Sequence, residues 1–151
     1  MPRFVSIANI FIDDILLWDG RIYVGVLGGA GSHAVSGMRV WSEDVGLVAR
    51  AGKDLNQDHL AQLSGLGIDS SGLLFISDRT ARAWQVFQQD EKRIEIYRFS
   101  DGAKDKVTPS FDYLPPTHRT AEGIHIYWDG ELLQLQEEIR KLRVTNPSAI
   151  L

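Results

Sequence analysis

The stretch VLGGAGSHAVSG, residues 26–37, places three glycines, Gly28, Gly29 and Gly31, between an apolar run and a segment with helical character. Glycine allows a chain to turn at positive φ and allows a ligand or a second backbone to approach closely. A glycine loop that opens a helix can bind a phosphate, because free amides and the helix dipole favour anions there. It can equally bind another ligand or only turn the chain, and most of the functional argument depends on which of these holds.

The bulk composition sets wide limits on the class of protein. The chain of 151 residues has 44% hydrophobic and 24% charged residues, which is typical of one globular domain or part of a larger one. The net charge is −4 and no block of Lys or Arg stands out, so we expect no nucleic-acid partner. The lack of cysteine excludes disulfides and thiolate metal sites and suits a cytoplasmic protein. The apolar run at residues 4–12 is too short for a signal peptide and no run could span a bilayer, so we expect no membrane partner.

Around the glycine loop, strands and helices alternate. Residues 3–12 predict one buried strand, and residues 15–18 and 21–26 predict a hairpin around Asp19-Gly20. After the loop we expect a helix over residues 32–41 with Ser32 as its N-cap, a strand over 45–49 and a helix over 57–66. This alternation predicts an α/β fold with a parallel sheet.

The second half of the chain begins with three β-type runs, at residues 73–77, 82–88 and 93–99, which predict an antiparallel meander with one wetter face. Residues 100–116 are loop-like. A short strand over 124–127 and an amphipathic helix over 132–142 follow. Residues 149–151 have the pattern of the start of another buried strand.

The loop also matches a dinucleotide-binding fingerprint, as Gly29-x-Gly31-x-x-Ala34 between a strand and a helix. Two features differ from that pattern. The next strand ends at Ala49-Arg50 rather than at an acidic residue, and a strand and a hairpin precede the loop. A dinucleotide-binding oxidoreductase domain is therefore one alternative, beside a turn that only packs a helix on a sheet.

The order of features resembles the N-terminal half of the ribokinase-like (PfkB) carbohydrate kinases over essentially the whole chain. The stretches that carry the resemblance are ANIFIDDIL with Asp13, GGAGSHAV with the pair Gly28-Gly29, WSEDVGLVARAGKD, LSGLGIDSSGL, and RTARAWQVF with Thr80. The resemblance implies an α/β fold of the ribokinase-like, Rossmann-like three-layer type, with a partial sheet and an inserted antiparallel β-lid. Residues 1–151 would form the N-terminal part of that domain, with lid segments around 15–27 and 73–99.

In that family the glycine pair binds the sugar, so the resemblance implies a substrate site for a small sugar or nucleoside. A strand-end carboxylate can accept two hydroxyl hydrogens through charge-assisted bonds, and ligands bind at strand ends in α/β sheets. The residues carried over as substrate-binding are Asp13, Gly28, Gly29, Gly31 and His33.

Three positions depart from the family pattern. His33 stands at the usual Asn, Ala30 at a frequent Lys and Ala8 at a frequent Gly, which leaves the identity of the sugar open.

The family's catalytic aspartate lies in a Gly-x-Gly-Asp motif whose amides hold the transferring phosphate, and this sequence has no such motif. We therefore expect no catalytic residue in this chain, an absent C-terminal ATP-binding half, and no tight binding of ATP and Mg²⁺, the cofactors of full-length members. The chain would be a fragment or split product that carries the sugar half-site and lid of a kinase that phosphorylates a sugar hydroxymethyl group, and it would be inactive alone. A non-catalytic binding or regulatory remnant of the kinase scaffold is the alternative.

The lid often pairs between subunits in the family, which predicts a homodimer through the β-lid.

Other polar side chains invite simpler interpretations. Asp13 and Asp14 are adjacent on a predicted strand and should face opposite ways. We expect His59 on a surface helix, His118 in a Pro-rich loop, and His125 on a core strand as a structural residue. No spacing of ligand-type residues suggests zinc, so we expect no metal site.

Overall fold

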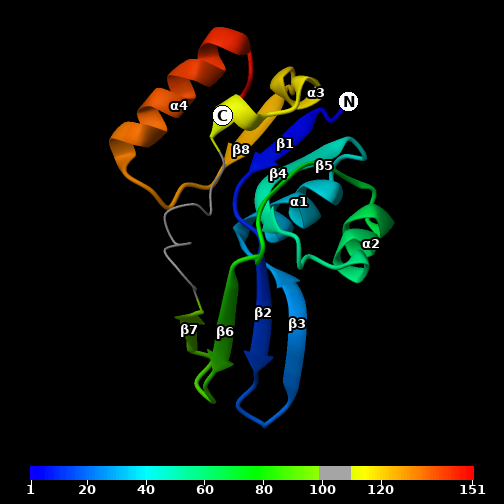
Figure 1. Ribbon diagram of the computed structural model, residues 1–151, viewed down its shortest axis with the longest axis vertical. Helices are drawn as coiled ribbons and strands as arrows, with labels where there is room; N and C mark the ends of the chain where they lie inside the picture. Colours follow the sequence, from blue (N-terminus) through cyan, green and yellow to red (C-terminus); the bar gives the residue numbers. More distant parts are fainter. Residues whose placement is uncertain (99–109) are drawn as a thin grey trace.

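The computed structural model describes residues 1–98 and 110–151. Its main sheet contains four parallel strands in the order β5-β4-β1-β8. These strands are β1 (Phe4–Ile7), β4 (Val45–Gly52), β5 (Ile68–Ser77) and β8 (Gly123–Ile126). The predicted α/β class with a parallel sheet is confirmed (Figure 1).

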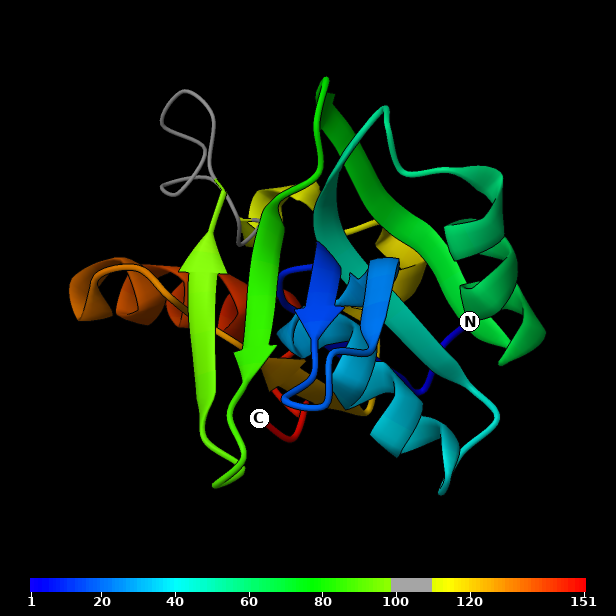
Figure 2. The same ribbon diagram turned by 90° about the horizontal axis from the view of Figure 1, so that it is seen from below.

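Helices cover both faces of the main sheet, which gives three layers. One core cluster joins β4 to α1 (Ala30–Arg39) and α2 (Gln57–Gly65), for example through Val35, Leu47 and Leu63. A second cluster on the other face joins β1 and β8 to α4 (Leu132–Thr145) through Leu142. The short η2 (Phe111–Tyr113) and α3 (Pro116–Arg119) lie between β7 and β8 in the chain. Seen from below, α4 and α2 lie on opposite sides of the molecule (Figure 2).

A second sheet projects from one end of the first (Figure 1). Its order is β3-β2-β6-β7, from β2 (Phe11–Leu16), β3 (Ile22–Gly28), β6 (Arg82–Phe87) and β7 (Arg93–Tyr97). Two antiparallel hairpins, β2–β3 and β6–β7, are joined side by side through a parallel pairing of β2 with β6. We call this mixed sheet the lid. The predicted hairpin around Asp19-Gly20 is confirmed, and Gly20 supplies its positive φ of 87°.

The prediction of one strand over residues 3–12 was wrong. The chain leaves the main sheet after Ile7, crosses over at residues 8–10 and enters the lid at Phe11. Ala8, Asn9 and Ile10 are all buried at this crossover, so the apolar run continues while the chain changes sheets. The pattern of apolar residues in a sequence indicates which residues are buried. Because the chain stays buried at the crossover, this pattern does not show the change from one sheet to the other.

The prediction of a three-stranded meander was wrong for residues 73–77, which belong to β5 and pair in parallel with β4. Only the second and third runs form a hairpin, as β6 and β7. The predicted strand end at Phe99 and most of the predicted loop at 100–116 lie outside the described residues.

Several boundaries also changed. Helix α1 begins at Ala30 with Gly29 as its N-cap, so Ser32 is not the cap; its hydroxyl donates to the Gly29 carbonyl instead. Ile150 makes a parallel bridge with Gly123, which confirms a strand-like start near the end of the chain, although Ile150 itself is exposed. None of the helices in the described part of the chain has the length and apolar character needed to cross a bilayer.

Candidate functional site

The glycine loop packs tightly against the crossover between β1 and β2. Gly29 has a φ of 89°, and a Cβ there would lie 2.8 Å from the Ile10 Cα. A Cβ on Gly31 would lie 2.6 Å from the Asn9 carbonyl oxygen. Asn9 also ties the two segments together, because its backbone carbonyl accepts from the Gly31 amide and its side-chain oxygen accepts from the Ala30 amide, both at 2.8 Å. Gly29 and Gly31 are therefore required by packing.

The hydrogen bonds from the Ala30 and Gly31 amides to Asn9 argue against a phosphate bound at the start of α1. A helix binds an anion through the free amides of its first turn. In α1 the amides of Ala30 and Gly31 already donate to Asn9. In addition, β3, which leads into the loop, is a strand of the lid and not of the parallel sheet on which the dinucleotide fingerprint depends. Both observations count against a pyrophosphate at this loop.

Gly28 serves a different purpose from its neighbours. It pairs with Phe11 across the β2–β3 hairpin, and a Cβ at this position would overlap the Asp13 Oδ2 atom. Asp13 is the third residue of β2 and only 7% exposed. The lack of a side chain at Gly28 therefore makes room for the Asp13 carboxylate.

Burial raises the pKa of the Asp13 carboxyl above its usual value. A hydrogen bond from Gln85 opposes this shift, and the charge of Glu95 adds to it. The Gln85 Nε2 donates to Asp13 Oδ1 at 3.4 Å and to Glu95 Oε1 at 2.7 Å. Among the described residues, one long side-chain hydrogen bond reaches this nearly buried carboxylate, which leaves it capacity to accept further hydrogen bonds.

Asp14 points the other way, as predicted. Its Oδ1 accepts from the Gly25 amide at 2.9 Å, and its Oδ2 accepts from Arg98 at 2.6 Å. Arg98 also lies over the ring of Trp84, at 5.1 Å from the centroid. Asp14 is thus fully engaged in holding the lid together.

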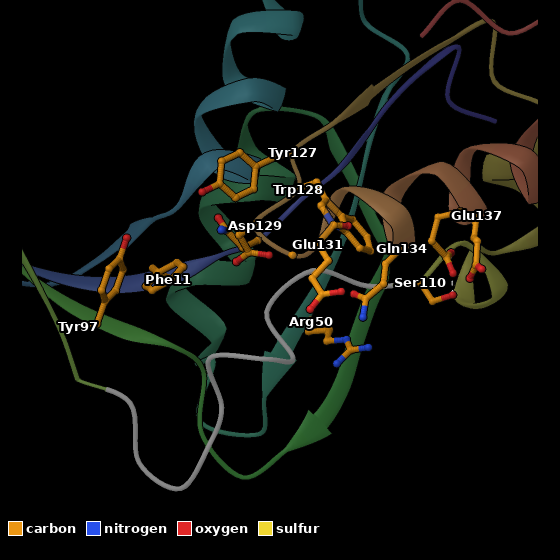
Figure 3. A pocket seen from close by; sticks show the side chains of 13 residues that line it. Phe11, Arg50, Tyr97, Ser110, Tyr127, Trp128, Asp129, Glu131, Gln134 and Glu137 are labelled. Atoms are coloured by element: carbon orange, nitrogen blue, oxygen red, sulfur yellow. Dashed lines mark hydrogen bonds between the residues drawn. The ribbon is translucent and has the colours of Figure 1, made fainter.

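A cavity of about 750 Å³ lies where the lid meets the ends of β1, β4 and β8 (Figure 3). Phe11 and Tyr97, on the face of the lid that carries Asp13, form one wall, with ring centroids 5.9 Å apart. Arg50 lines it from β4, and Tyr127, Trp128 and Asp129 line it just beyond β8. Ligands bind at this end of the strands in α/β sheets. The cavity therefore joins aromatic, cationic and acidic groups at the expected edge.

His33 is exposed on α1, near enough to Asp13 for its charge to act on that carboxyl. The structure thus places Gly28 directly against Asp13, while Gly29 and Gly31 hold the loop against the crossover.

His59 lies on a surface helix, α2, as predicted, but the prediction of a loop around His118 was wrong. His59 is only 5% exposed and its Nε2 lies 2.7 Å from the Gly25 carbonyl oxygen, so it anchors α2 to the lid. His118 is fully buried in α3 rather than in a loop, and burial lowers its pKa. His125 lies on β8 as predicted, but it is exposed and its Nδ1 lies 3.0 Å from the Ser6 hydroxyl.

Asn9, Gln85 and the segment 127–129 were not predicted from the sequence as site residues. The segment follows a predicted strand directly, so the rule that ligands bind beyond strand ends could have found it. Nothing in the sequence distinguishes Gln85 from Gln88 or Gln89. Over residues 1–98 and 110–151, no group of three His, Asp or Glu side chains could hold a metal ion.

The fold is that of the N-terminal half of the ribokinase-like sugar kinases. A ribokinase from Giardia lamblia is 18% identical with a TM-score of 0.72, and the match covers 98% of this chain and 49% of that one. A putative ribokinase II from E. coli is 14% identical with a TM-score of 0.73, over 99% and 52%. An uncharacterized sugar kinase from Pyrococcus horikoshii is 14% identical with a TM-score of 0.69, over 95% and 52%.

The chain thus spans about half the length of these solved structures. No family model matches the sequence, and no curated protein matches it either. The structure thus has the ribokinase-like fold.

Proposed function

We propose that this chain forms the sugar half-site and lid of a carbohydrate or nucleoside kinase scaffold. The observation that carries the proposal is the Asp13 carboxylate, buried at the junction of lid and main sheet and fitted against the bare backbone of Gly28. The site would bind a small polyol, either a sugar or the sugar part of a nucleoside.

The chemistry of the site suits hydroxyl groups. An ionised carboxylate only accepts hydrogen bonds, and each of its oxygens can take a hydroxyl hydrogen. Asp13 has one long bond from Gln85, so it retains capacity for a ligand. The aromatic rings of Phe11 and Tyr97 offer the apolar surface against which a sugar ring packs. His33 would contribute a hydrogen bond at the rim.

Phosphoryl transfer is a wider proposal that rests on the fold. In a full-length member, ATP with Mg²⁺ would phosphorylate a hydroxymethyl group of the bound sugar. That reaction depends on groups that stabilise charge on the transferring phosphate. Since the sequence has no Gly-x-Gly-Asp motif, we derive no catalytic step for this chain and propose that it is inactive alone. Robust ADP release by the purified chain with ATP, Mg²⁺ and ribose would contradict this.

Binding is tested by isothermal titration calorimetry with ribose and with inosine. We expect weak binding of at least one of them by the wild type. The Asp13→Ala variant should lose it, because the acceptor is removed. Asp78→Ala is the matched control, since Asp78 is exposed and pairs with Lys53 at the surface. An Asp13→Ala variant that binds as well as the wild type would refute the proposed site.

Two further binding measurements separate the alternatives. A non-catalytic remnant would give no response to any polyol in a thermal-shift panel. A dinucleotide-binding domain would bind NADH, and Asp13→Ala would leave that binding intact. The occupied amides at the start of α1 favour the polyol hypothesis over the dinucleotide one.

The lack of cysteine fits a cytoplasmic location, which we propose on that ground.

A further inference from the structure

We propose that Gln85, on β6 of the lid, is the positioning residue that holds the Asp13 carboxylate in its ligand-binding orientation. This inference rests on the proposed polyol site and adds to it a residue outside both the glycine loop and the first strands. It also narrows the ligand chemistry at Asp13 to hydroxyl donors.

Asp13, Gln85 and Glu95 form a hydrogen-bonded network on the face of the lid that carries Asp13. Asp13 and Ala83 are neighbours in the β2–β6 register, so Gln85 lies one pleat further along the same face. Gln85 is directly opposite Glu95 on β7. The Gln85 Nε2 donates to both carboxylates, at 3.4 Å to Asp13 and 2.7 Å to Glu95. The Tyr97 hydroxyl donates to the other oxygen of Glu95 at 2.5 Å.

This hydrogen-bonded network fixes which way the side-chain amide of Gln85 points. Carboxylate oxygens accept and do not donate, so the NH₂ group must face Asp13 and Glu95. The flipped amide would place its oxygen against two carboxylates, and the assignment therefore follows from the network. The Gln85 Oε1 is then directed away from both. It is buried, in a side chain only 6% exposed, and it has no hydrogen-bond partner among the described residues.

A buried acceptor without a partner is costly, and it lies beside a carboxylate that also needs donors. A ligand hydroxyl can donate to the ionised Asp13 carboxylate, whereas the phosphate group of an ester, whose oxygens accept at neutral pH, cannot. The charged groups that act on Asp13 are Glu95 and Arg93 from β7 and His33 from α1. Glu95 and Arg93 act on the Asp13 carboxyl in opposite directions, and within residues 1–98 and 110–151 the Gln85 amide is the side-chain hydrogen-bond donor to it.

The decisive measurement needs no ligand. The Asp13 carboxyl carbon is followed by ¹³C NMR over a pH titration in the wild type, Gln85→Met and Gln89→Met. Methionine keeps the length of glutamine and removes its donor. We expect a higher titration midpoint for Asp13 in Gln85→Met, because a hydrogen bond to the ionised form is lost. Gln89 is exposed near the hairpin turn, so Gln89→Met should match the wild type.

Gln85→Glu is the second variant, and it keeps the test decisive if Gln85→Met does not fold. A third carboxyl group between Asp13 and Glu95 should raise the Asp13 midpoint further, giving the order wild type, Met, Glu. A wild-type midpoint in either folded Gln85 variant would overturn the proposal. A merely structural role for Gln85 would change stability and leave this midpoint unchanged.

Ribose titrations at several pH values then connect the positioning to the ligand. The affinity of Gln85→Met should fall about tenfold at neutral pH, as expected for one lost charge-assisted contact, and its pH profile should move upward with the Asp13 midpoint. Ribose 5-phosphate should bind no more tightly than ribose. If the wild type binds neither ribose nor inosine, the proposed function fails, while the Asp13 titration still decides the role of Gln85.

Discussion

Gly28 and Gly37 show how differently one added methyl group acts at two nearby positions. At Gly28 the methyl group would overlap Asp13 Oδ2, so the carboxylate must turn away. At Gly37, in α1, it would meet nothing within 4 Å. We predict that Gly28→Ala reduces ribose affinity at least about tenfold, the effect of losing one good polar contact. Gly37→Ala should bind normally and gain up to about 1 kcal/mol in stability from helix propensity. Calorimetry and urea unfolding measure the two effects, and equal affinities for both variants would contradict this account of Gly28.

The buried charge of Asp13 should cost stability at neutral pH. Burial raises the pKa of Asp13 in the folded state above its ordinary value of 3.8. The folded protein therefore binds the proton more tightly than the unfolded chain, and stability falls as the pH rises from 3.8 through the folded pKa. We predict that Asp13→Asn has a higher urea midpoint than the wild type at pH 7.

Two comparisons make that prediction specific. The advantage of Asp13→Asn should disappear below pH 3.8, where both states of the wild type are protonated. Asp14→Asn should instead be destabilised by about 1–3 kcal/mol at pH 7, because it loses the half-buried ion pair with Arg98. A lower midpoint for Asp13→Asn at pH 7 would show that the Asp13 charge stabilises the fold rather than serving a ligand.

Among the elements, the crossover from β5 to β6 is the second point at which the chain passes from the main sheet into the lid, and Asp54 holds it. Its Oδ1 accepts from the Thr80 amide at 2.6 Å and from the Thr80 hydroxyl at 2.8 Å, and its Oδ2 accepts from Arg82 at 2.8 Å. Burial alone would raise the pKa of Asp54, but the bonds from Arg82 and Thr80 outweigh it and lower the pKa.

We predict that Asp54→Ala lowers the free energy of unfolding by about 3 kcal/mol at pH 7, since a partly buried cation and two donors lose their partner. Asp78→Ala, at an exposed ion pair with Lys53, should cost less than about 1 kcal/mol. Because the folded pKa of Asp54 is lowered, its contribution is present above pH 3.8 and is lost as the pH falls through the folded value. Urea unfolding at pH 7 and pH 3 tests both parts, and a constant difference between wild type and Asp54→Ala would refute the second.

The sequence predicted most elements but not the sheet to which each belongs. Alternation and turn signals located the β2–β3 and β6–β7 hairpins and the helices α2 and α4. The split of residues 3–12 and the assignment of residues 73–77 depend on hydrogen bonding between segments far apart in the chain, which local periodicity does not report. The start of α1 was missed because its amides are satisfied by Asn9, from another part of the chain, rather than by a local cap.

The residues of the candidate site, like the elements, could be predicted only in part from the sequence. Asp13, Gly28 and His33 are predicted from the order of motifs along the chain, and their role in binding stays a prediction, although the structure places Gly28 directly against Asp13. Gln85 could not be found, because its importance comes from the pairing of β6 with both β2 and β7.

At the scale of the whole molecule, the face of the lid opposite Asp13 carries several large exposed apolar side chains. Leu16, Ile22, Trp84, Ile94 and Ile96 share one face across all four strands and are each at least 39% exposed. Exposed apolar patches of this kind mark interaction surfaces. We propose that a second copy of the chain covers it, in line with lid pairing in the family that the sequence resembles.

We predict that light scattering on a size-exclusion column gives about twice the chain mass of 16.9 kDa. Ile96→Glu should shift the protein to the monomer, because a charge would be buried without a partner. Val144→Glu, at an equally apolar and 85% exposed position on α4, should leave the dimer intact. A monomeric wild type at high concentration, or a dimer that survives Ile96→Glu, would rule out this interface.

The parallel seam between β2 and β6 has a consequence for how the molecule is made. It pairs Asp13 with Ala83, and the segment between them contains β3, α1, β4, α2 and β5. Contacts between residues so distant in sequence form late, since the loop that joins them must first be ordered. During synthesis, Asp13 leaves the ribosome early but waits for β6 and β7 before it meets Gln85. We therefore expect the growing chain to bind a ligand at Asp13 only after β6 has been made and has paired with β2, so that ribose binding would report this pairing.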